Sequence, residues 1–356
     1  MKLPRFLALV LCCLLLVTAC SSKDKDPKPQ EPEETPQEEV PVGVVGEDPG
    51  TGEPGQEDVP AFRHLFTGLP AEEDNRSRPW AVVVENQLQA RPQTGLTEAD
   101  VVYEVLAEGD ITRFLAIYQS RVPDVIGPVR SIRPYFIELG LAVDGVIVHA
   151  GWSPEAQNIL QNGQIAYINE VKGGDHVYFW RSKDRSAPHN VYTSAELMAK
   201  GAEDKKYRTN WNETSLSFLE ELPAAGTLPG ESAREAEIRY YRSYAVQYRY
   251  DGEKGAYLRF MDGEPHRDKE SGEQITVSNV LVAVTDHRVL DSVGRRAVNV
   301  RGPGRGWLLQ GGKIREIEWQ MKDGFIRAFV NGEEQKLLPG QTWIQIVPDF
   351  AQISYE

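Results

Sequence analysis

Residues 101–120 read VVYEVLAEGDITRFLAIYQS, two β-strand patterns separated by Gly109-Asp110. A Gly-Asp pair between two such runs is typical of a two-residue β-hairpin turn. The register that this turn sets places Leu106 opposite Arg113. One face of the hairpin then carries Glu104, Leu106, Glu108, Ile111, Arg113 and Leu115. Both glutamates become diagonal neighbours of Arg113, and the opposite face is predicted to pack in the core through Val105, Phe114 and Ala116.

Strands and helices alternate around this hairpin. The predicted elements are a buried strand over 80–85, a helix from about Ser131 to Leu141, a strand over 145–150, and helices that begin at Ser153-Pro154 and at the Thr193–Glu196 capping box. Ser and Thr suit a helix start because their side chains accept hydrogen bonds from the first free amides. Gly163 is predicted to end the second helix. We therefore predict a mixed α/β domain over residues 62–221.

The rest of the chain is predicted to be nearly all β. Residues 222–234 are rich in Pro, Gly and Ala and are predicted to form a linker. Beyond them, alternating runs are separated by hairpin-type pairs: Asp251-Gly252, Asp262-Gly263, Asp323-Gly324 and Asn331-Gly332. Residues 280–284 form the clearest core strand. The fold class is therefore α+β, with a smaller β-rich domain over residues 235–356.

A lipobox, Leu16-Val17-Thr18-Ala19-Cys20, lies near the start of the chain. It follows two basic residues and an apolar run over 6–17 that is too short to cross a bilayer, which needs about 20 helical residues. We predict a lipoprotein signal peptide over residues 1–19. Acylation of Cys20, as by palmitate, would then hold the protein on the extracytoplasmic face of the plasma membrane. The alternative is an ordinary signal peptide with a chance cysteine.

Residues 20–61 separate this cysteine from the predicted domains. Between Ser21 and Ala61 the chain carries twelve acidic residues against three lysines and no aromatic residue. Such a segment cannot bury enough apolar surface to form a core, so we predict a disordered, extended tether. The formal net charge of −14 and the lack of a basic patch argue against nucleic-acid binding. The membrane, reached through the lipid, is the first expected partner.

Short motifs beyond residue 80 carry a resemblance to a known family. They are Glu85-Asn86, Arg91-Pro92-Gln93-Thr94-Gly95-Leu96, Gly127-Pro128-Val129-Arg130-Ser131-Ile132-Arg133-Pro134, Val148-His149-Ala150-Gly151-Trp152, Pro188-His189-Asn190-Val191-Tyr192-Thr193 and Pro339-Gly340-Gln341-Thr342-Trp343-Ile344. Together they resemble the YerB-like lipoproteins of Gram-positive bacteria, a family catalogued as a domain of unknown function in two parts. The resemblance implies a surface lipoprotein and brings no established activity.

Arg130 and Arg133 flank the predicted helix start at Ser131. The positive end of a helix disfavours cations, so an anion is expected beside them. This anion could be a ligand carboxylate or phosphate held by guanidinium groups and amides. It could equally be an internal partner from the acids nearby: Glu85, Glu104 or Glu108.

Two histidines extend this set of candidates. His149 ends a predicted buried strand, a position where α/β folds often place functional groups. His189 follows a polar loop, so both could line one cleft with the arginines. The candidate binding residues are Arg91, Arg113, Arg130, Arg133, His149, His189 and Asn190. The candidate acid–base residues are His149, His189 and Glu104, although each histidine could instead be structural.

Other chemistries find little support in the sequence. There is no Gly-x-Ser-x-Gly elbow or His-Glu-x-x-His pair, and Cys20 is the only cysteine left once the signal is cut, so no disulfide or cysteine nucleophile is expected. Residues 302–306 are Gly-rich but lack the ending of a phosphate-binding loop. We expect no metal and no cofactor. Three tryptophans of the second half are expected in the core: Trp307, Trp319 and Trp343.

Three functions remain open. The first is a non-catalytic accessory protein of the cell envelope with a protein partner. The second is a binding module for an anionic small molecule or wall fragment. The third is a hydrolase or transferase that uses a histidine and a glutamate as acid and base on envelope material.

Overall fold

The structure is a computed structural model that describes residues 61–171, 173–223 and 226–356. The predicted signal peptide, Cys20 and the acidic segment up to residue 60 lie outside the described residues. The described part of the chain belongs to one compact unit. Among these residues, no helix combines the length and apolar character needed to span a membrane.

The first half mixes strands with short helices. Its strands are β1 Phe62–Arg63, β2 Pro70–Ala71, β3 Trp80–Glu85, β4 Val101–Glu108, β5 Ile111–Tyr118, β6 Val146–His149, β7 Tyr167–Asn169, β8 Trp180–Arg181 and β9 Val191–Tyr192. Its helices are α1 Pro134–Ala142, α2 Pro154–Asn162 and α3 Ala195–Asp204, with 3-10 turns η1 Leu88–Ala90, η2 Leu96–Glu98 and η3 Asp175–Tyr178.

The second half contains strands throughout. They are β10 Glu231–Ser232, β11 Glu235–Tyr241, β12 Tyr244–Asp251, β13 Ala256–Met261, β14 Glu264–Pro265, β15 Thr276–Val277, β16 Asn279–Thr285, β17 His287–Val289, β18 Arg296–Val298, β19 Gly304–Gln310, β20 Lys313–Lys322, β21 Phe325–Val330, β22 Glu333–Glu334, β23 Thr342–Pro348 and β24 Gln352–Tyr355. The predicted α+β class, with a mixed first half and a β-rich second half, is confirmed.

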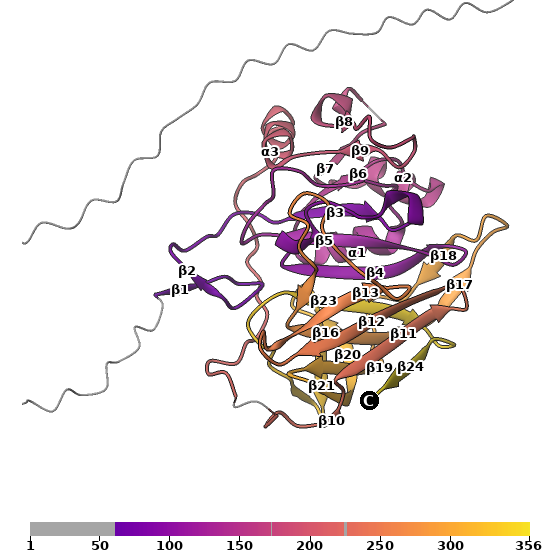
Figure 1. The fold of residues 1–356 in the computed structure, drawn as a ribbon. Helices are drawn as coiled ribbons and strands as arrows, with labels where there is room; N and C mark the ends of the chain where they lie inside the picture. Colours follow the sequence, from indigo (N-terminus) through magenta and orange to yellow (C-terminus); the bar gives the residue numbers. More distant parts are fainter. Residues whose placement is uncertain (1–60, 172, 224–225) are drawn as a thin grey trace, which may run out of the picture. The chain divides into compact units, whose positions relative to one another are not determined.

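One large sheet crosses both halves. Its order is β22-β21-β20-β19-β16-β23-β4-β5-β3-β6-β7, and β10, at the end of the predicted linker, pairs with β20. The halves meet where β23 pairs with β4 in parallel, from Thr342 beside Val101 to Ile346 beside Val105. In Figure 1 the indigo strands of the first half therefore continue directly into the orange and yellow strands of the second.

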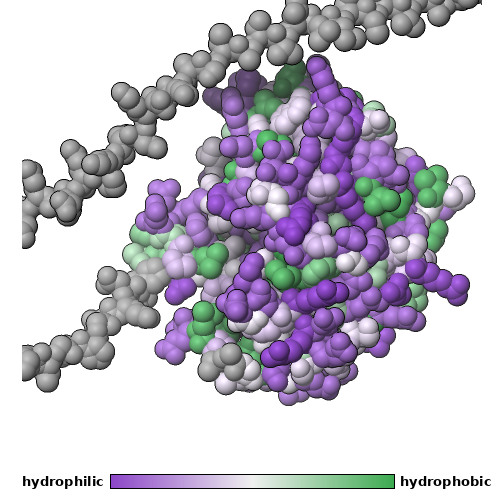
Figure 2. Space-filling model, in the orientation of Figure 1, coloured by the Kyte–Doolittle hydropathy of each residue, from purple (hydrophilic) through white to green (hydrophobic). Residues whose placement is uncertain are grey.

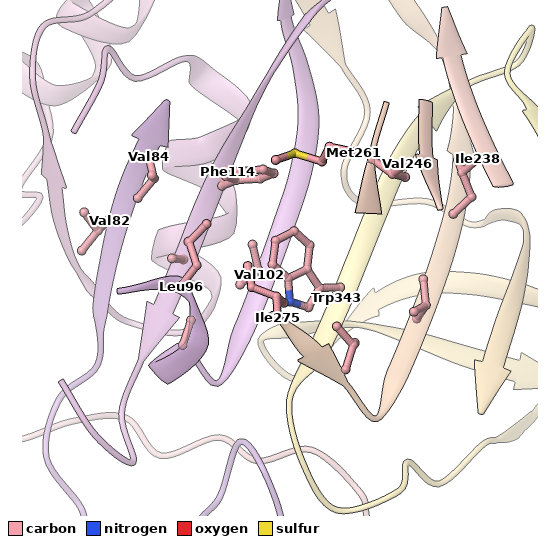
Figure 3. Packing of buried hydrophobic residues seen from close by; sticks show 14 of the residues in the cluster. Val82, Val84, Leu96, Val102, Phe114, Ile238, Val246, Met261, Ile275 and Trp343 are labelled. Atoms are coloured by element: carbon pink, nitrogen blue, oxygen red, sulfur yellow. The ribbon is translucent and has the colours of Figure 1, made fainter. Parts of the chain in front are cut away.

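Two apolar clusters cover the two faces of this sheet. On one face, Val102 and Phe114 pack with residues of a second, six-stranded sheet that includes β11, β12 and β13 (Figure 3). On the other face, Val83 and Leu115 pack with residues of α1 and α2. The surface shown in Figure 2 is mostly hydrophilic, with apolar side chains in small separate groups. The three tryptophans expected in the core differ in burial. Trp319 and Trp343 are buried, whereas Trp307 is half-buried.

The predicted hairpin forms, but the predicted register of its two strands is wrong by one residue. β4 ends at Glu108 and β5 begins at Ile111, so the turn lies at Gly109-Asp110 as predicted. A bulge between Leu106 and Glu108 places Arg113 opposite Val105 and Phe114 opposite Glu104. An extra residue in one strand moves the paired side chains to the other face. Glu104 and Arg113 therefore lie on opposite faces of the sheet.

Two helices begin at residues other than those predicted, whereas the predicted start and end of α2 are confirmed. α1 begins at Pro134 with Arg133 as its cap, not at Ser131, because proline fixes the geometry of the first turn. α3 is capped by Ser194, which accepts a hydrogen bond from the Leu197 amide, while Thr193 donates to the Tyr178 carbonyl. The Ser153 cap and the end of α2 at Gly163 are confirmed.

Candidate functional site

Polar residues line the edge of the sheet where four strands end. β3, β6 and β7 are parallel, and β4 runs the same way because β5, between β4 and β3, is antiparallel to both. These four strands end at Glu85, His149, Asn169 and Glu108. Carboxyl ends of parallel strands are a common place for functional groups. We call this set of four residues the strand-end site.

Glu85 lies close to two of the candidate binding residues, Arg130 and His189. Its side chain is 1% exposed; Arg130 Nε lies 3.1 Å from Oε1 and His189 Nδ1 lies 3.1 Å from Oε2. Neither contact has hydrogen-bond alignment, so Glu85 Oε2, Arg130 Nε and His189 Nδ1 have no hydrogen-bond partner among the described residues. The Arg130 and His189 side chains are 22% and 17% exposed. They therefore stand between the buried carboxylate and the solvent.

Glu108 pairs with the next two arginines. Its carboxylate lies 3.1 Å from Arg113 Nη2 and also contacts Arg133 Nη2. Arg113 donates in addition to the Ser131 carbonyl, at 2.8 Å. Burial lowers the pKa of Arg113 to about 10, so the group stays charged at neutral pH. Arg130 and Arg133 thus both have internal carboxylate partners, Glu85 and Glu108, as one of the two sequence interpretations predicted.

Glu104 lies on the other face and has a different partner from the one predicted. Arg259 Nη2 donates to it at 2.6 Å, and both side chains are 0% exposed. The hydroxyls of Tyr244 and Thr112 donate at 2.6 and 2.8 Å, and the Asn86 amide donates at 3.3 Å. We call these five residues the buried network. It joins the two halves and keeps Glu104 from acting as a solvent-accessible acid or base.

His266 extends this network and was missed by the sequence analysis. It contacts Arg259 through Nδ1, and its Nε2 lies 2.9 Å from Gln93 Oε1. Burial, and then the charge of Arg259, hold the pKa of His266 well below its usual range, so it is neutral. No sequence pattern around Arg259 or His266 points to these contacts, because the partners lie far apart in the chain.

His149 is fully buried at the end of β6. Its Nδ1 lies 2.7 Å from the Gly151 carbonyl oxygen and so carries the ring proton, while Nε2 has no described hydrogen-bond partner. Burial lowers the pKa of His149 to about 4. Within the described residues, no hydrogen bond or ion pair joins His149 to Glu85 or His189. His149 therefore fits the structural interpretation better than the catalytic one.

Asn169 is a strand-end residue that the sequence analysis missed. It is paired with His149 in the parallel register, and its Nδ2 is buried without a described hydrogen-bond partner. Its Oδ1 accepts from the Gly151 amide at 3.0 Å. The signal that could have found it is the one used for His149, a polar residue directly after a short apolar strand.

The last two candidates hold loops in place. Asn190 accepts from Arg181 at 3.0 Å and donates to the Ser182 carbonyl at 3.1 Å. Arg91 pairs with Asp262 at 2.9 Å, with its guanidinium 5.2 Å from the centre of the Tyr244 ring. Among the residues that the structure describes, no group of three or more His, Cys, Asp or Glu is placed to hold a metal ion.

Comparisons with known proteins give a consistent result. Residues 66–208 match the model described as "Protein of unknown function (DUF3048) N-terminal domain", and residues 236–344 match its C-terminal counterpart. The chain is 39% identical over 288 residues to "Putative lipoprotein YerB" of Bacillus subtilis (strain 168), covering 80% of this chain and 86% of the relative. The crystal structure of the Bacillus subtilis YerB protein matches with a TM-score of 0.74 and 38% identity, covering 82% of this chain and 99% of that one.

Proposed function

Because the chain belongs to this two-part family, as its resemblance to YerB-like lipoproteins implied, we propose that it is a lipid-anchored envelope protein that acts by binding a partner. The name of the Bacillus subtilis relative, "Putative lipoprotein YerB", agrees with a lipid-anchored protein. The finer parts of the proposal are acylation at Cys20, a position on the extracytoplasmic face of the membrane, and a role without catalysis.

The anchor follows from the lipobox and from the length of chain behind it. Two or three acyl chains hold a protein on a membrane durably, because each buried CH₂ contributes about 0.8 kcal/mol. If the acidic residues between Cys20 and Ala61 form the tether that their composition predicts, the mean span is about 30–40 Å. The folded part could then meet partners at a distance from the bilayer.

The charge pairing at the strand-end site is the observation that supports binding over catalysis. Arg130 and Arg133 are paired with Glu85 and Glu108, and His149 is fully buried. An anionic ligand at Arg130 would have to displace Glu85. A partner that uses the outer surface needs no such exchange, so a protein partner of the envelope fits better than an anionic small molecule.

Cross-linking in intact cells tests this proposal. We expect the wild type to capture specific envelope proteins, and Cys20→Ser to lose both membrane attachment and capture while the folded part keeps its thermal midpoint. Cys13→Ser is the matched control, because that residue is predicted to leave with the signal peptide. Specific capture by a fully soluble Cys20→Ser protein, or no specific capture by the wild type, would contradict the proposal.

A second candidate function rests on one contact. The Glu85 carboxylate lies 3.1 Å from His189 Nδ1, and His189 is partly exposed. A carboxylate close to a partly exposed imidazole is a pairing that acid–base catalysis on wall material could use. Incubation with purified envelope would distinguish the candidates: a product released by the wild type and by the exposed-histidine control His176→Asn, and absent with His189→Asn, would favour catalysis.

A further inference from the structure

An open pocket lies between the two halves of the chain, away from the residues that form the strand-end site. Thr94, Gly95, Glu98 and residues 121–125 line it from the first half, and Asp268, Glu270 and Ser271 line it from the second. Its volume is about 470 Å³. We call it the seam pocket. It exists only when the two halves are folded together, because each supplies part of the wall.

Acidic side chains dominate the lining of the seam pocket. Glu98, Asp124, Asp268 and Glu270 contribute carboxylates, and Arg121 is the one basic residue of the lining. Arg121 pairs with Glu98 at 3.0 Å, but its side chain is 70% exposed, so the ion pair is weak. Among the described residues, none forms an ion pair with Asp124 or Glu270. The lining therefore carries an uncompensated negative charge.

The carboxylate of Asp268 is fixed in the pocket wall. It accepts hydrogen bonds from the amides of Gly95 and Leu96 at 2.6 and 3.1 Å. The buried Tyr118 donates a hydrogen bond to the Gly95 carbonyl, and the pKa of its hydroxyl responds to the nearby negative charges. Burial raises the pKa of Tyr118 well above its usual value, and the charges of Asp268, Glu98 and Asp100 raise it further. The negative charge is thus built into the fold and does not depend on mobile side chains alone.

Thr94 adds a second and independent feature. Thr94 is one of the lining residues and is 1% exposed, and its Oγ1 has no hydrogen-bond partner among the described residues. A buried hydroxyl without a partner costs free energy unless something bonds to it. Its oxygen can accept a hydrogen bond from a donor that enters the pocket.

We infer that the seam pocket binds a primary ammonium group, on a lysine side chain or amino terminus of a peptide or on a small free amine. An ammonium group is a compact cation with three donors, which matches a hydroxyl acceptor beside several carboxylates. The inference depends neither on the lipid anchor nor on Glu85.

Calorimetric titration of residues 21–356, which retain every described residue, tests the inference. The probes are acetyl-Gly-Lys-Gly-amide, its uncharged norleucine analogue and cadaverine. We expect the lysine peptide to bind and the norleucine peptide not to bind. Binding of cadaverine as well would identify the ammonium group alone as sufficient, and its failure would assign the pocket to peptide amines; the inference holds in both cases.

Variants locate the binding in the pocket. Asp124→Asn with Glu270→Gln should weaken lysine-peptide binding about three- to tenfold, because two exposed carboxylate contacts are lost. Thr94→Val, which keeps the shape and removes the acceptor, should weaken it by a similar factor. Glu72→Gln with Glu155→Gln is the control for net charge. Equal binding of the lysine and norleucine peptides, or unchanged binding by the Asp124/Glu270 variant, would overturn the inference.

Discussion

Glu85 and Glu104 are both buried carboxylates, and they lie on opposite faces of one sheet. They are the cross-strand neighbours of Arg113 and Phe114, which are adjacent residues of β5. Glu104 accepts aligned hydrogen bonds from four side chains, including Arg259. Glu85 has two charged or titratable neighbours at 3.1 Å, and neither contact is aligned as a hydrogen bond.

This difference separates a structural role from a functional one. A buried charge with all its partners in place contributes to a unique packing of the two sheets, and loss of one partner leaves the other uncompensated. At Glu85 the partners are partly exposed and can be hydrated if the pair opens. We therefore expect the buried network to determine folding and Glu85 to tolerate substitution.

The largest expected effect is that of Glu104→Gln. It removes the charge partner of the fully buried Arg259 and should lower the free energy of unfolding by about 3–5 kcal/mol. Chemical denaturation measures this loss. Adding Arg259→Met removes the unpaired charge and should recover part of the stability. A denaturation midpoint like that of the wild type would show that Glu104 is not needed for the packing of the sheets.

The next effect depends on pH and concerns His149, on the same face as Glu85. The pKa of His149 is about 4 in the folded protein against an ordinary 6.5, so the unfolded state binds more protons between these values. The stability from keeping His149 neutral is complete above pH 6.5 and is lost as the pH falls toward 4, by about 3 kcal/mol. His149→Gln should flatten that part of the stability curve. The exposed control His176→Gln should leave it unchanged, and an equal slope in all three proteins would contradict the assignment.

Arg113→Met is expected to have a smaller effect. It removes a buried partner of Glu108 and a donor to the Ser131 carbonyl, while Arg133 still contacts Glu108. We expect a loss of about 1–3 kcal/mol in the free energy of unfolding. Arg121→Met, at a surface pair, should change it by less than about 1 kcal/mol. Equal effects of the two variants would mean that the Arg113–Glu108 pair is solvated.

The smallest effect on stability is expected for Glu85→Gln, at about 1 kcal/mol or less, because Arg130 and His189 can be hydrated. This variant should instead gain phosphate binding, since Arg130 loses its internal anion. Chemical-shift titration with inorganic phosphate measures the gain. Glu170→Gln, which frees the more exposed Arg181, is the control. No gain over that control would mean that Arg130 is not positioned for an anion.

Local patterns predicted much of the fold but not the partners of its charged residues. The turn at Gly109-Asp110 and the Ser153 cap depend on neighbouring residues and were predicted from them. The bulge after Leu106 was missed, because an extra residue in a strand leaves no clear trace in an alternating pattern. That one residue changed the face on which Glu104 lies. Its true partner, Arg259, is 155 positions away, and no local rule reaches so far.

The strand-end site was predictable in part for the same reason. Polar residues that end strands are visible in the sequence, and His149 was found in that way. Glu85 and Glu108 were named as internal partners of Arg130 and Arg133, but the sequence could not show that the arginines take these acids and not an external anion. That choice depends on how close segment 127–133 lies to the ends of β3 and β4.

The most direct test compares the two carboxylates side by side. Urea unfolding at pH 7 of Glu85→Gln and Glu104→Gln, in otherwise identical chains, gives two free energies of unfolding. We expect the Glu104 variant to be less stable than the Glu85 variant by at least about 2 kcal/mol. Equal free energies, or a greater loss at Glu85, would contradict the division between a buried network that stabilises the fold and a Glu85 carboxylate that is free to change.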